Sequence, residues 1–585
     1  MTFRQLAEQF LLIGQESSRL KIMHLLADLF AQVTPQEAQH ITYLSLGTVR
    51  PAYQGNQFNF AEKNSIKTLA SLTHSTPELY AHTVKKSGDI GLSILAGDWP
   101  YTDHQLSVEQ VYNQLVHIES LSGTGVQEEK MHLLGLLLKK MDALSASYVV
   151  RIIMGTMRLG FSDMTVIDAL SWMLVGDKSL KSALEEAFNV RADLGFIALQ
   201  VKQQGAAALK DIKPALGVPI RPAAAERAES PTAVIEKIGP CVVQPKLDGF
   251  RVQIHLDKQN LGDTSKQHLW FFSRNLLDMS SMFPDLARAL ETCSTQSLIV
   301  EGEALVYDEK NQKYVAFQET VKRKRKHGIE EAVHNLPLHL FLFDILYYNG
   351  EIVVSKPHYE RRALLEKIFS ACTSPVIHVI EEKQVTTAVE LDRYFKQIVS
   401  SGLEGLVAKR PDASYQAGKR NFNWIKLKRH EQGHINDTID AVILGYYAGR
   451  GKRVHFGVGA FLVGVYNSEL DRFETIAKIG TGLTDTEWRD LKKTCDTQAV
   501  AEQPSNIVCA PELAPDVWVQ PTTVVVIRAD EITQSPLHTA GATQSDLGLA
   551  LRFPRFMGYS VDKTATQATT VKEIKELYKQ QFSKK

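Results

Sequence analysis

The hydrophobic pattern of the chain changes its period near residues 214–231, and this change limits the fold more than any other feature. Before it, apolar residues recur at three- and four-residue spacing in the segments 17–33, 107–121 and 128–144. That spacing is typical of amphipathic helices. The sequence therefore predicts an all-α region over residues 1–215, followed by something of a different class.

Residues 214–231 are rich in proline, alanine and small polar residues, which is typical of a linker. Beyond them, β-branched and aromatic runs alternate with helical patterns such as residues 359–369. The strand-like runs are residues 241–248, 251–257, 269–275, 297–308, 338–348 and 405–410. We expect an α+β domain over residues 216–428.

Short strand-like runs with glycine turns occupy the last part of the chain and predict a small β-barrel over residues 429–585. The runs are residues 440–449, 459–467, 473–483 and 522–532, and a lysine-bearing helical pattern over residues 571–585 follows them. An OB-type barrel is the expected form if the neighbouring domain acts on nucleic acid.

Charge and composition describe an ordinary globular protein. Lys and Arg number 66, and so do Asp and Glu, while hydrophobic residues make up 44% and charged residues 23% of the chain. Residues 1–215 hold 19 basic and 21 acidic residues, so neither that region nor the remainder is basic as a whole. Any surface that binds nucleic acid must therefore be local.

The five cysteines lie far apart and form no CxxC pair, which excludes a zinc ribbon and disfavours a disulfide framework. No apolar run approaches the roughly 18–20 residues of a membrane span. The N-terminal residues 1–14 alternate like an amphipathic helix without a signal-type cleavage region. We expect a cytoplasmic or nucleoid-associated protein with reduced thiols and no membrane partner.

Lys246 is the sharpest local feature, because it ends a strand-like run and is followed by Asp248 and Gly249. In a purely structural interpretation, the lysine caps a strand before an Asp-Gly turn. In a functional one, its amine attacks phosphorus and is activated by neighbouring cations. Gly249 would let the backbone approach a nucleotide closely.

The companions of this lysine also have structural alternatives. Glu303 would serve equally as a charge at a strand edge, and Phe343 as a core residue. Lys426 and Lys428 alternate on one strand face, which usually faces solvent. It is their order along the chain that favours a shared site.

Six motifs follow one another: KLDGFR (246–251), FSRN (272–275), EGEALVYD (301–308), FDILYYNG (343–350), EGLVAK (404–409) and NWIKLK (423–428). In this order they resemble the covalent nucleotidyltransferase superfamily. Within it, the chain resembles the three-domain ATP-dependent DNA ligases of archaea and of eukaryotic replication. Further resemblance to that family lies in residues 17–30, 43–55, 158–170, 529–541 and 551–556, so it covers nearly the whole chain.

The resemblance implies a multidomain fold. An all-α DNA-binding domain would span residues 1–215, and an α+β nucleotidyltransferase domain, an ATP-grasp-like adenylation domain, would span residues 216–428. An OB-fold β-barrel would span residues 429–585.

The resemblance also implies the reaction. Lys246 would attack the α-phosphorus of ATP, release pyrophosphate and carry AMP as a phosphoramide. The AMP would pass to the 5′-phosphate of a nick in duplex DNA, and the 3′-hydroxyl would then displace it and seal the strand. Surrounding cations would keep the lysine reactive and stabilise the pentavalent charge.

Roles for individual residues follow from the same resemblance. Nucleotide contacts are expected from Gln244, Arg251, Arg274, Glu303, Phe343, Lys409, Arg420, Lys426 and Lys428. Among these, Phe343 would stack on adenine, and the arginine forks would hold ribose and phosphate oxygens. Glu303 and Glu404 would lie at Mg²⁺, with Mn²⁺ as an alternative, because hard cations prefer carboxylate and water oxygens.

Binding of a nick needs phosphate contacts with little base readout. The densest basic tract is Lys322, Arg323, Lys324, Arg325 and Lys326, with Arg158, Arg453, Arg552 and Arg555 as further candidates. The tract could also be a solvated helix or a nuclear-import signal. We expect a monomer, and a sliding clamp is a candidate partner that no motif identifies.

Two positions depart from the family pattern. Gln244 stands where a glutamate usually accepts a bond from the adenine amino group, and its amide could donate as well as accept. Ser560 stands where an arginine of the last motif is thought to orient pyrophosphate, while Asp562 and Lys563 remain. The first departure suggests looser base selectivity, and the second suggests slower self-adenylation.

Several alternatives stay open at this level. An RNA ligase or a capping-type nucleotidyltransferase shares the superfamily motifs, although the helical N-terminal region and residues 552–555 favour DNA ligase. An NAD-dependent ligase is disfavoured because the chain has no four-cysteine zinc module. A catalytically weak scaffold that binds nicks is the alternative from another functional class.

Overall fold

The structure is a computed structural model of the 585-residue chain. It describes every residue except 56–57, 124, 261–266, 309–312, 315–319, 321–322, 324–332, 334–335, 373, 402, 429–437, 450, 561–562 and 584–585. The chain divides into two compact units. The first comprises Met1–Tyr80 with Ile94–Arg429, and the second comprises Ala81–Ser93 with His430–Lys585.

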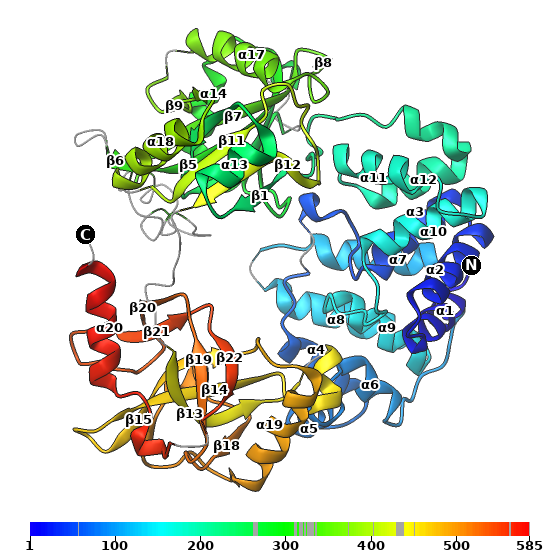
Figure 1. Ribbon diagram of the computed structural model, residues 1–585. Helices are drawn as coiled ribbons and strands as arrows, with labels where there is room; N and C mark the ends of the chain where they lie inside the picture. Colours follow the sequence, from blue (N-terminus) through cyan, green and yellow to red (C-terminus); the bar gives the residue numbers. More distant parts are fainter. Residues whose placement is uncertain are drawn as a thin grey trace. The chain divides into compact units, whose positions relative to one another are not determined.

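The N-terminal region is helical, as its periodicity predicts (Figure 1). Its α-helices are α1 (Phe3–Gln15), α2 (Arg19–Gln32), α3 (Pro35–Ser45), α4 (Glu62–Leu72), α5 (Pro77–Ser87), α6 (Ile90–Leu95), α7 (Val108–Ser120), α8 (Val126–Leu138), α9 (Ala143–Ile153), α10 (Asp163–Val175), α11 (Lys181–Val190) and α12 (Leu194–Gln204). Short 3₁₀ helices lie at η1 (Ala52–Gln54) and η2 (Gly205–Lys210). Capping boxes begin α1, α3 and α7.

The continuous pattern over residues 128–144 forms two helices rather than one. Helix α8 ends at Leu138, and Asp142 begins α9 because its carboxylate accepts hydrogen bonds from the amides of Leu144 and Ser145. A strong N-cap therefore starts a new helix inside an apolar stretch that periodicity alone reads as continuous.

Part of the predicted linker over residues 214–231 forms regular structure. Strand β1 (Ala224–Ala228) pairs in parallel with β12 (Arg420–Lys428), and α13 (Pro231–Ile238) begins directly after it. The composition signal was misleading because the segment just before β1 satisfies its backbone groups with side chains of the neighbouring sheet instead of water.

Two sheets build the α+β region, and strands lie in all six segments expected to form them. One sheet has the order β1-β12-β11-β2-β10, with β2 (Cys241–Pro245), β10 (Lys383–Val385) and β11 (Gly405–Lys409). The other has the order β4-β3-β5-β7-β8, with β3 (Phe250–Asp257), β4 (Leu269–Ser273), β5 (Ser297–Asp308), β7 (Leu338–Tyr348) and β8 (Glu351–Ile352). Strand β6 (Lys313–Tyr314) pairs with β5, and β9 (Ile377–Val379) pairs with β7.

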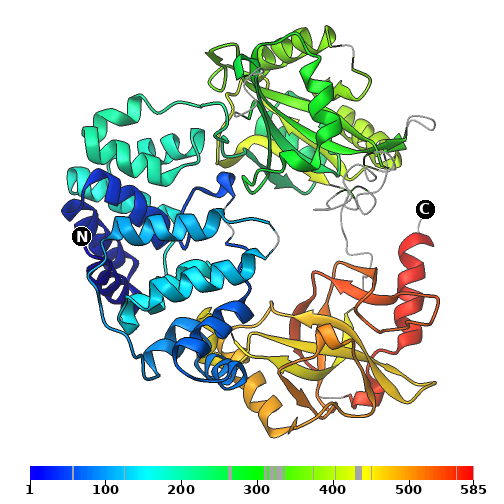
Figure 2. The same ribbon diagram turned by 180° about the vertical axis from the view of Figure 1, so that it is seen from behind.

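Helices cover the outer faces of these sheets (Figures 1 and 2). Helices α14 (Pro284–Glu291) and α17 (His358–Ser370) pack on the sheet that contains β3, and α13 and α18 (Ala388–Ser400) pack on the sheet that contains β2. Short 3₁₀ turns lie at η3 (Lys258–Asn260) and η4 (Ser280–Met282). The other faces of the two sheets meet through residues such as Phe343 of β7 and Trp424 of β12.

The second unit is rich in strands and holds the four runs expected to form them. Its strands are β13 (Ile439–Tyr447), β14 (Ala460–Asn467), β15 (Arg472–Ile479), β16 (Ala499–Val500), β17 (Ile507–Val508), β18 (Val517–Val519), β19 (Val524–Arg528), β20 (Glu531–Ser535), β21 (Gly548–Arg552) and β22 (Arg555–Tyr559). Its helices beyond residue 430 are α19 (Asp485–Thr497), α20 (Val571–Ser583), η5 (Gly451–Phe456), η6 (Pro511–Leu513) and η7 (Ala565–Gln567). One sheet has the order β16-β18-β13-β14-β15-β17, with β19 bridging β13 and β22, and β20 and β21 form a separate pair.

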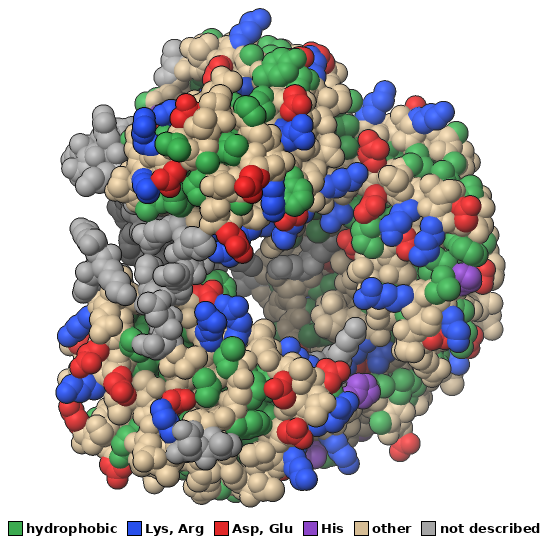
Figure 3. All heavy atoms as spheres, in the orientation of Figure 1, with side chains coloured by type: hydrophobic (Ala, Val, Ile, Leu, Met, Phe, Trp, Pro, Cys, Tyr) green, Lys and Arg blue, Asp and Glu red, His purple; other side chains and the backbone are tan. Residues whose placement is uncertain are grey.

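The surface and the thiols agree with the composition. Basic and acidic side chains are interspersed on the face drawn in Figure 3. All five cysteines are free, and the sulfurs of Cys293 and Cys372 lie 2.7 Å apart as a thiol contact. Across the described residues, no helix combines the length and the apolarity needed to cross a bilayer.

Candidate active site

Lys246 lies just after β2, at the centre of an ion-paired cluster. Its amine pairs with Glu404, whose other oxygen accepts a hydrogen bond from Lys428 at 2.8 Å. Strand pairing explains the meeting, because β11 lies between β2 and β12 and places Gly405 opposite Lys428. The amide of Lys246 also donates to the carbonyl of Gly405 at 2.8 Å. The three side chains are 23–29% exposed, so a ligand can reach them.

Three further cations, Lys426, Arg420 and Arg274, lie near this cluster. Burial lowers the pKa of Lys426, and so does the charge of Arg420, Lys428, Arg274 and Lys246 in that order. Arg274 and Arg420 are themselves exposed. Such convergence of positive charge from separate strands suits a polyphosphate ligand.

Glu303 faces the same lysine from the other sheet. Its Oε1 accepts a hydrogen bond from the amide of Gly249 at 3.1 Å. A side chain at Gly249 would lie 2.6 Å from the carbonyl oxygen of Ala304, so only glycine allows this approach. Burial raises the pKa of Glu303 to about 7, although the charges of Lys246 and Arg251 oppose the shift.

Glu303 and Glu404 provide the donor set that a magnesium ion would need. Both carboxylates act on Lys246, one by ion pairing and the other by its charge. Among the described residues no group of three or more potential ligand side chains occurs. Mg²⁺ commonly binds through one or two carboxylates together with substrate phosphates and water, so the two residues fit this ion.

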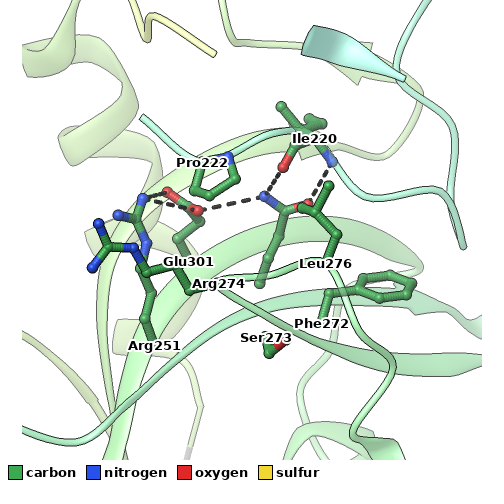
Figure 4. Close-up of a pocket in the computed structure, with 9 residues that line it drawn as sticks. Ile220, Pro222, Arg251, Phe272, Ser273, Arg274, Leu276 and Glu301 are labelled. Carbon is green, nitrogen blue, oxygen red and sulfur yellow. Dashed lines mark hydrogen bonds and ion pairs between the residues drawn. The ribbon is translucent and has the colours of Figure 1, made fainter. Parts of the chain in front are cut away.

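Arg251 belongs to a buried network at the start of β3 (Figure 4). Its guanidinium donates to both oxygens of Glu301 at 2.9 and 3.1 Å and to the carbonyl of Ala223 at 2.9 Å. Tyr415 donates to Glu301 at 2.8 Å and accepts from the amide of Ala223. The network fixes the arginine and ties the segment before β1 to the sheet.

Alternate residues of β3 continue this network. Gln253 exchanges two hydrogen bonds with the backbone of Ile220, at 2.7 and 2.9 Å, and His255 accepts from the amide of Gly217 at 3.2 Å. Burial lowers the pKa of His255 to about 3, so its ring is neutral. Successive side chains of a strand point to opposite faces, so Arg251, Gln253 and His255 lie on one face. This alternation was the sequence signal for a contact between β3 and the segment before β1.

Phe343 lies in β7 beside two cations and a tryptophan. The Arg251 guanidinium lies 5.4 Å and the Lys409 amine 5.2 Å from its ring centroid, and Trp424 meets it edge-on at 6.2 Å. Lys409 is buried, lies 4.3 Å from the Trp424 ring centroid and donates to the carbonyl of Phe343. Burial lowers the pKa of Lys409 to about 8. This lysine thus supports Phe343 from within the protein.

Gln244 is buried in β2 and donates from its amide to Glu382 at 2.7 Å. Glu382 in turn contacts His358 at 2.8 Å. Neither Glu382 nor His358 stands in one of the six motifs, so motif order could not identify them.

The basic tract contains a residue with a structural role. Lys322, Lys324, Arg325 and Lys326 lie outside the described residues. Arg323 is 2% exposed and donates to both oxygens of Asp285 at 2.9 Å. The expectation that Arg323 faces DNA is therefore corrected: its guanidinium is directed inward, to a carboxylate near the start of α14.

The remaining cations expected at DNA are Arg158 of the first unit and Arg453, Arg552 and Arg555 of the second. Arg158 is exposed. Arg453 donates to the carbonyl of Gly459 and lies over the Trp488 ring at 4.9 Å. Arg552 pairs with Glu531, and Arg555 pairs with Asp530. The last two pairs are exposed enough to exchange a carboxylate for a phosphate.

The final motif is only partly described. Ser560 donates its amide to the carbonyl of Val524 at 3.0 Å, and Lys563 pairs with Asp440 at 2.6 Å. Asp562 lies outside the described residues. The effect of Ser560 on self-adenylation stays a prediction.

Three family models match the chain. A model described as DNA ligase N terminus matches residues 2–171, one described as ATP dependent DNA ligase domain matches residues 222–428, and one described as ATP dependent DNA ligase C terminal region matches residues 455–563. Together they match well over half of the sequence.

Curated relatives match along the full length. A probable DNA ligase of Dictyoglomus turgidum is 44% identical over 591 residues, covering 100% of this chain and 99% of the relative. A DNA ligase of Sulfurisphaera tokodaii is 35% identical over 604 residues, covering 100% and 98%. A solved structure titled Pmar-Lig_Pre matches with a TM-score of 0.54 at 15% identity, covering 95% of this chain and 99% of that one, and supports the fold alone.

Proposed function

The chain belongs to the ATP-dependent DNA ligase family and is a ligase enzyme, and on that premise we propose that Lys246 is the residue that carries AMP. The observation behind this proposal is the arrangement around its amine. Lys246 is ion-paired with Glu404 and faces Glu303, and its charge acts on Lys426 together with the charges of Lys428, Arg274 and Arg420. An amine nucleophile, two carboxylates and a group of cations are the parts that phosphoryl transfer to a lysine requires.

In this proposal three in-line displacements follow. The amine of Lys246 forms a bond to the α-phosphorus of ATP as the bond to pyrophosphate breaks, and the amine proton leaves. The 5′-phosphate of a nick then displaces Lys246 from AMP. Finally the 3′-hydroxyl displaces AMP and forms the phosphodiester. Positioning and charge neutralisation supply most of the acceleration in such reactions.

The ion pair between Lys246 and Glu404 has a role in the first step. An amine attacks phosphorus only without its proton, and the neighbouring carboxylate holds the ammonium form in place. Glu303 and Glu404 would hold Mg²⁺ when it is bound, and the ion would supply charge neutralisation at the phosphates. If Glu404 leaves this ion pair, the amine of Lys246 can lose its proton and attack.

The other nucleotide contacts follow from their positions. Phe343 would stack on the base, and the cations Arg251 and Lys409 near its ring would help to hold it in place. Arg251 would hold ribose or phosphate oxygens from a guanidinium that Glu301 and Ala223 keep in orientation. Arg274 and Arg420 are exposed and would meet the phosphates.

We assign the substrate as nicked duplex DNA, bound by three domains over residues 1–215, 216–428 and 429–585. The last would be an OB-type barrel, a proposal supported by the antiparallel order β13-β14-β15 and by helix α19, which follows β15. Arg158, Arg453, Arg552 and Arg555 are the proposed backbone contacts. Binding through phosphates predicts an affinity that falls steeply with salt.

The decisive experiment is labelling of the protein with α-³²P-ATP and Mg²⁺, followed by peptide mass spectrometry and a nick-sealing assay. We expect one AMP on Lys246 and joining of nicked DNA. An adduct on another side chain, or joining without any adduct, contradicts the proposal.

A further inference from the structure

The amide of Gln244 is held by the carboxylate of Glu382, which comes just before the neighbouring strand β10. Strand β10 runs antiparallel to β2 with Lys383 opposite Val243, so Glu382 falls opposite Gln244, one step further along. The contact is a hydrogen bond of 2.7 Å between Gln244 Nε2 and Glu382 Oε2. Gln244 lies two residues before Lys246 and is 2% exposed. A residue that fixes the orientation of the Gln244 amide therefore acts next to the proposed nucleophile.

The carboxylate of Glu382 determines which end of the Gln244 amide faces it. An ionised carboxylate offers only acceptors, so the group of Gln244 that meets it must be the NH₂. His358, the first residue of α17, places Nε2 2.8 Å from the same carboxylate oxygen. With the proton on Nε2, His358 donates to Glu382 and holds it in position. Burial by itself would raise the pKa of Glu382, but the bond from His358 together with the charges of His358, Lys409 and Arg362 lowers it.

The other end of the amide is left to a ligand. Because the amide is planar, its oxygen points away from Glu382, and within the described part of the chain Gln244 Oε1 makes no hydrogen bond. A free glutamine can turn its amide over and offer either a donor or an acceptor. Here a turned amide would set its oxygen against the oxygen of Glu382, which is a costly contact in a buried place.

We propose that Glu382 and His358 are positioning residues that hold Gln244 with its oxygen toward the base, so that the site selects a 6-aminopurine donor over a 6-oxopurine donor. An adenine amino group can donate to this oxygen, whereas the O6 of guanine is an acceptor and would face an acceptor. The looser selectivity expected from a glutamine is thereby removed. The inference rests on the proposed function, since it needs a nucleotide bound beside Lys246.

The test compares ATP with GTP in single and paired variants, using kcat/KM for self-labelling at Lys246. Glu382→Gln lets the Gln244 amide turn over, and we expect the preference for ATP to fall on the order of tenfold, the worth of one hydrogen bond. Gln244→Glu sets two carboxylates together and should weaken labelling by both nucleotides. The double variant Gln244→Glu with Glu382→Gln exchanges donor and acceptor across the pair and should restore the preference for ATP.

Three controls separate positioning from general damage. Glu381→Gln changes the exposed neighbouring carboxylate and should leave the ATP to GTP ratio unchanged. His358→Leu removes the donor to Glu382 and should shift the ratio in the same direction by less, which gives a second measure if Glu382→Gln folds poorly. Sealing of DNA that already carries AMP should fall less than self-labelling by ATP in Glu382→Gln and His358→Leu, because the donor nucleotide is no longer selected in that step.

The outcomes distinguish the inference from its premise. If the wild-type protein takes up no nucleotide on Lys246, the proposed function fails. If it does, but Glu382→Gln and His358→Leu both leave the ATP to GTP ratio within twofold, only the inference fails. A double variant no more selective for ATP than Gln244→Glu alone overturns it as well.

Discussion

The α+β region contains two sets of ion pairs that differ in how far their side chains are exposed to solvent. Arg361 and Asp344 are joined by two hydrogen bonds of 2.8 and 3.1 Å, and both side chains are 0% exposed. Lys246, Glu404 and Lys428 form a cluster whose members are 23–29% exposed. The first set can only stabilise the fold, whereas the second can exchange its partners for a phosphate or a metal.

The difference shows why an active-site ion pair is a poor source of stability. A partly exposed pair gains little because water and salt screen it. A fully buried pair leaves an uncompensated charge when it is broken, so its loss is expensive. We therefore expect substitutions in the cluster to abolish chemistry and spare the fold, and substitutions in the buried pair to do the reverse.

Lys246→Ala is the largest expected effect. Removal of the nucleophile should lower self-labelling by ATP at least about 10⁴-fold, while the free energy of unfolding should change by no more than about 0.5 kcal/mol. Sealing of DNA that already carries AMP should persist. Lys419→Ala, at an exposed lysine, is the matched control and should label normally. Residual labelling of the Lys246→Ala protein would show that Lys246 is not the residue that carries AMP.

Arg361→Met tests the contribution of the buried pair to stability. It leaves Asp344 charged and unpaired in the interior, and we expect the free energy of unfolding to fall by about 3–5 kcal/mol. Arg410→Met breaks an exposed pair with Asp412 and should change it by less than about 1 kcal/mol. Chemical denaturation of both proteins measures the difference. Equal losses would show that burial does not separate the two kinds of pair.

Acid should reveal the buried pair in the wild-type chain. Burial would raise the pKa of Asp344, but the charges of Arg361 and Lys409 outweigh it and lower the pKa from 3.8 to about 2. A carboxyl with a lower pKa in the folded state adds stability that is present above pH 3.8 and is lost as the pH falls toward 2. We expect wild-type protein to lose about 2 kcal/mol more than Asp344→Asn over that interval. Parallel acid unfolding curves would contradict this assignment.

The structure brings Lys246, Glu404 and Lys428 together, as motif order suggests, because each belongs to a motif at a strand end. Lys246, Glu404 and Lys428 lie in three motifs, and antiparallel pairing of adjacent strands brings such ends together. The strand-like runs were also correct, since their β-branched and aromatic residues pack on helices. Order along the chain was enough for these features.

The supporting residues could not be found in that way. Glu382 lies 138 positions from Gln244, between two short strands without a strong pattern. Arg323 looked like part of a solvated basic tract, yet its partner Asp285 lies 38 positions earlier. Contacts of this kind depend on the packing of distant elements, and neither periodicity nor composition records which elements meet.

Substitution of Glu303 should give the smallest change in stability, and its pH dependence can be compared directly with that of Asp344. Burial raises its pKa from 4.5 to about 7, so the folded chain loses stability as the pH rises from 4.5 through 7, the opposite sign to Asp344. Glu303→Gln, measured against wild-type protein without Mg²⁺, should be more stabilising at pH 8 than at pH 5 by about 1–2 kcal/mol. Denaturant unfolding at the two pH values tests this. A difference that does not depend on pH would mean that the carboxylate is as well accommodated as Asp344. The expected result would instead identify Glu303 as a charge that the fold tolerates at a cost in stability because the reaction requires it.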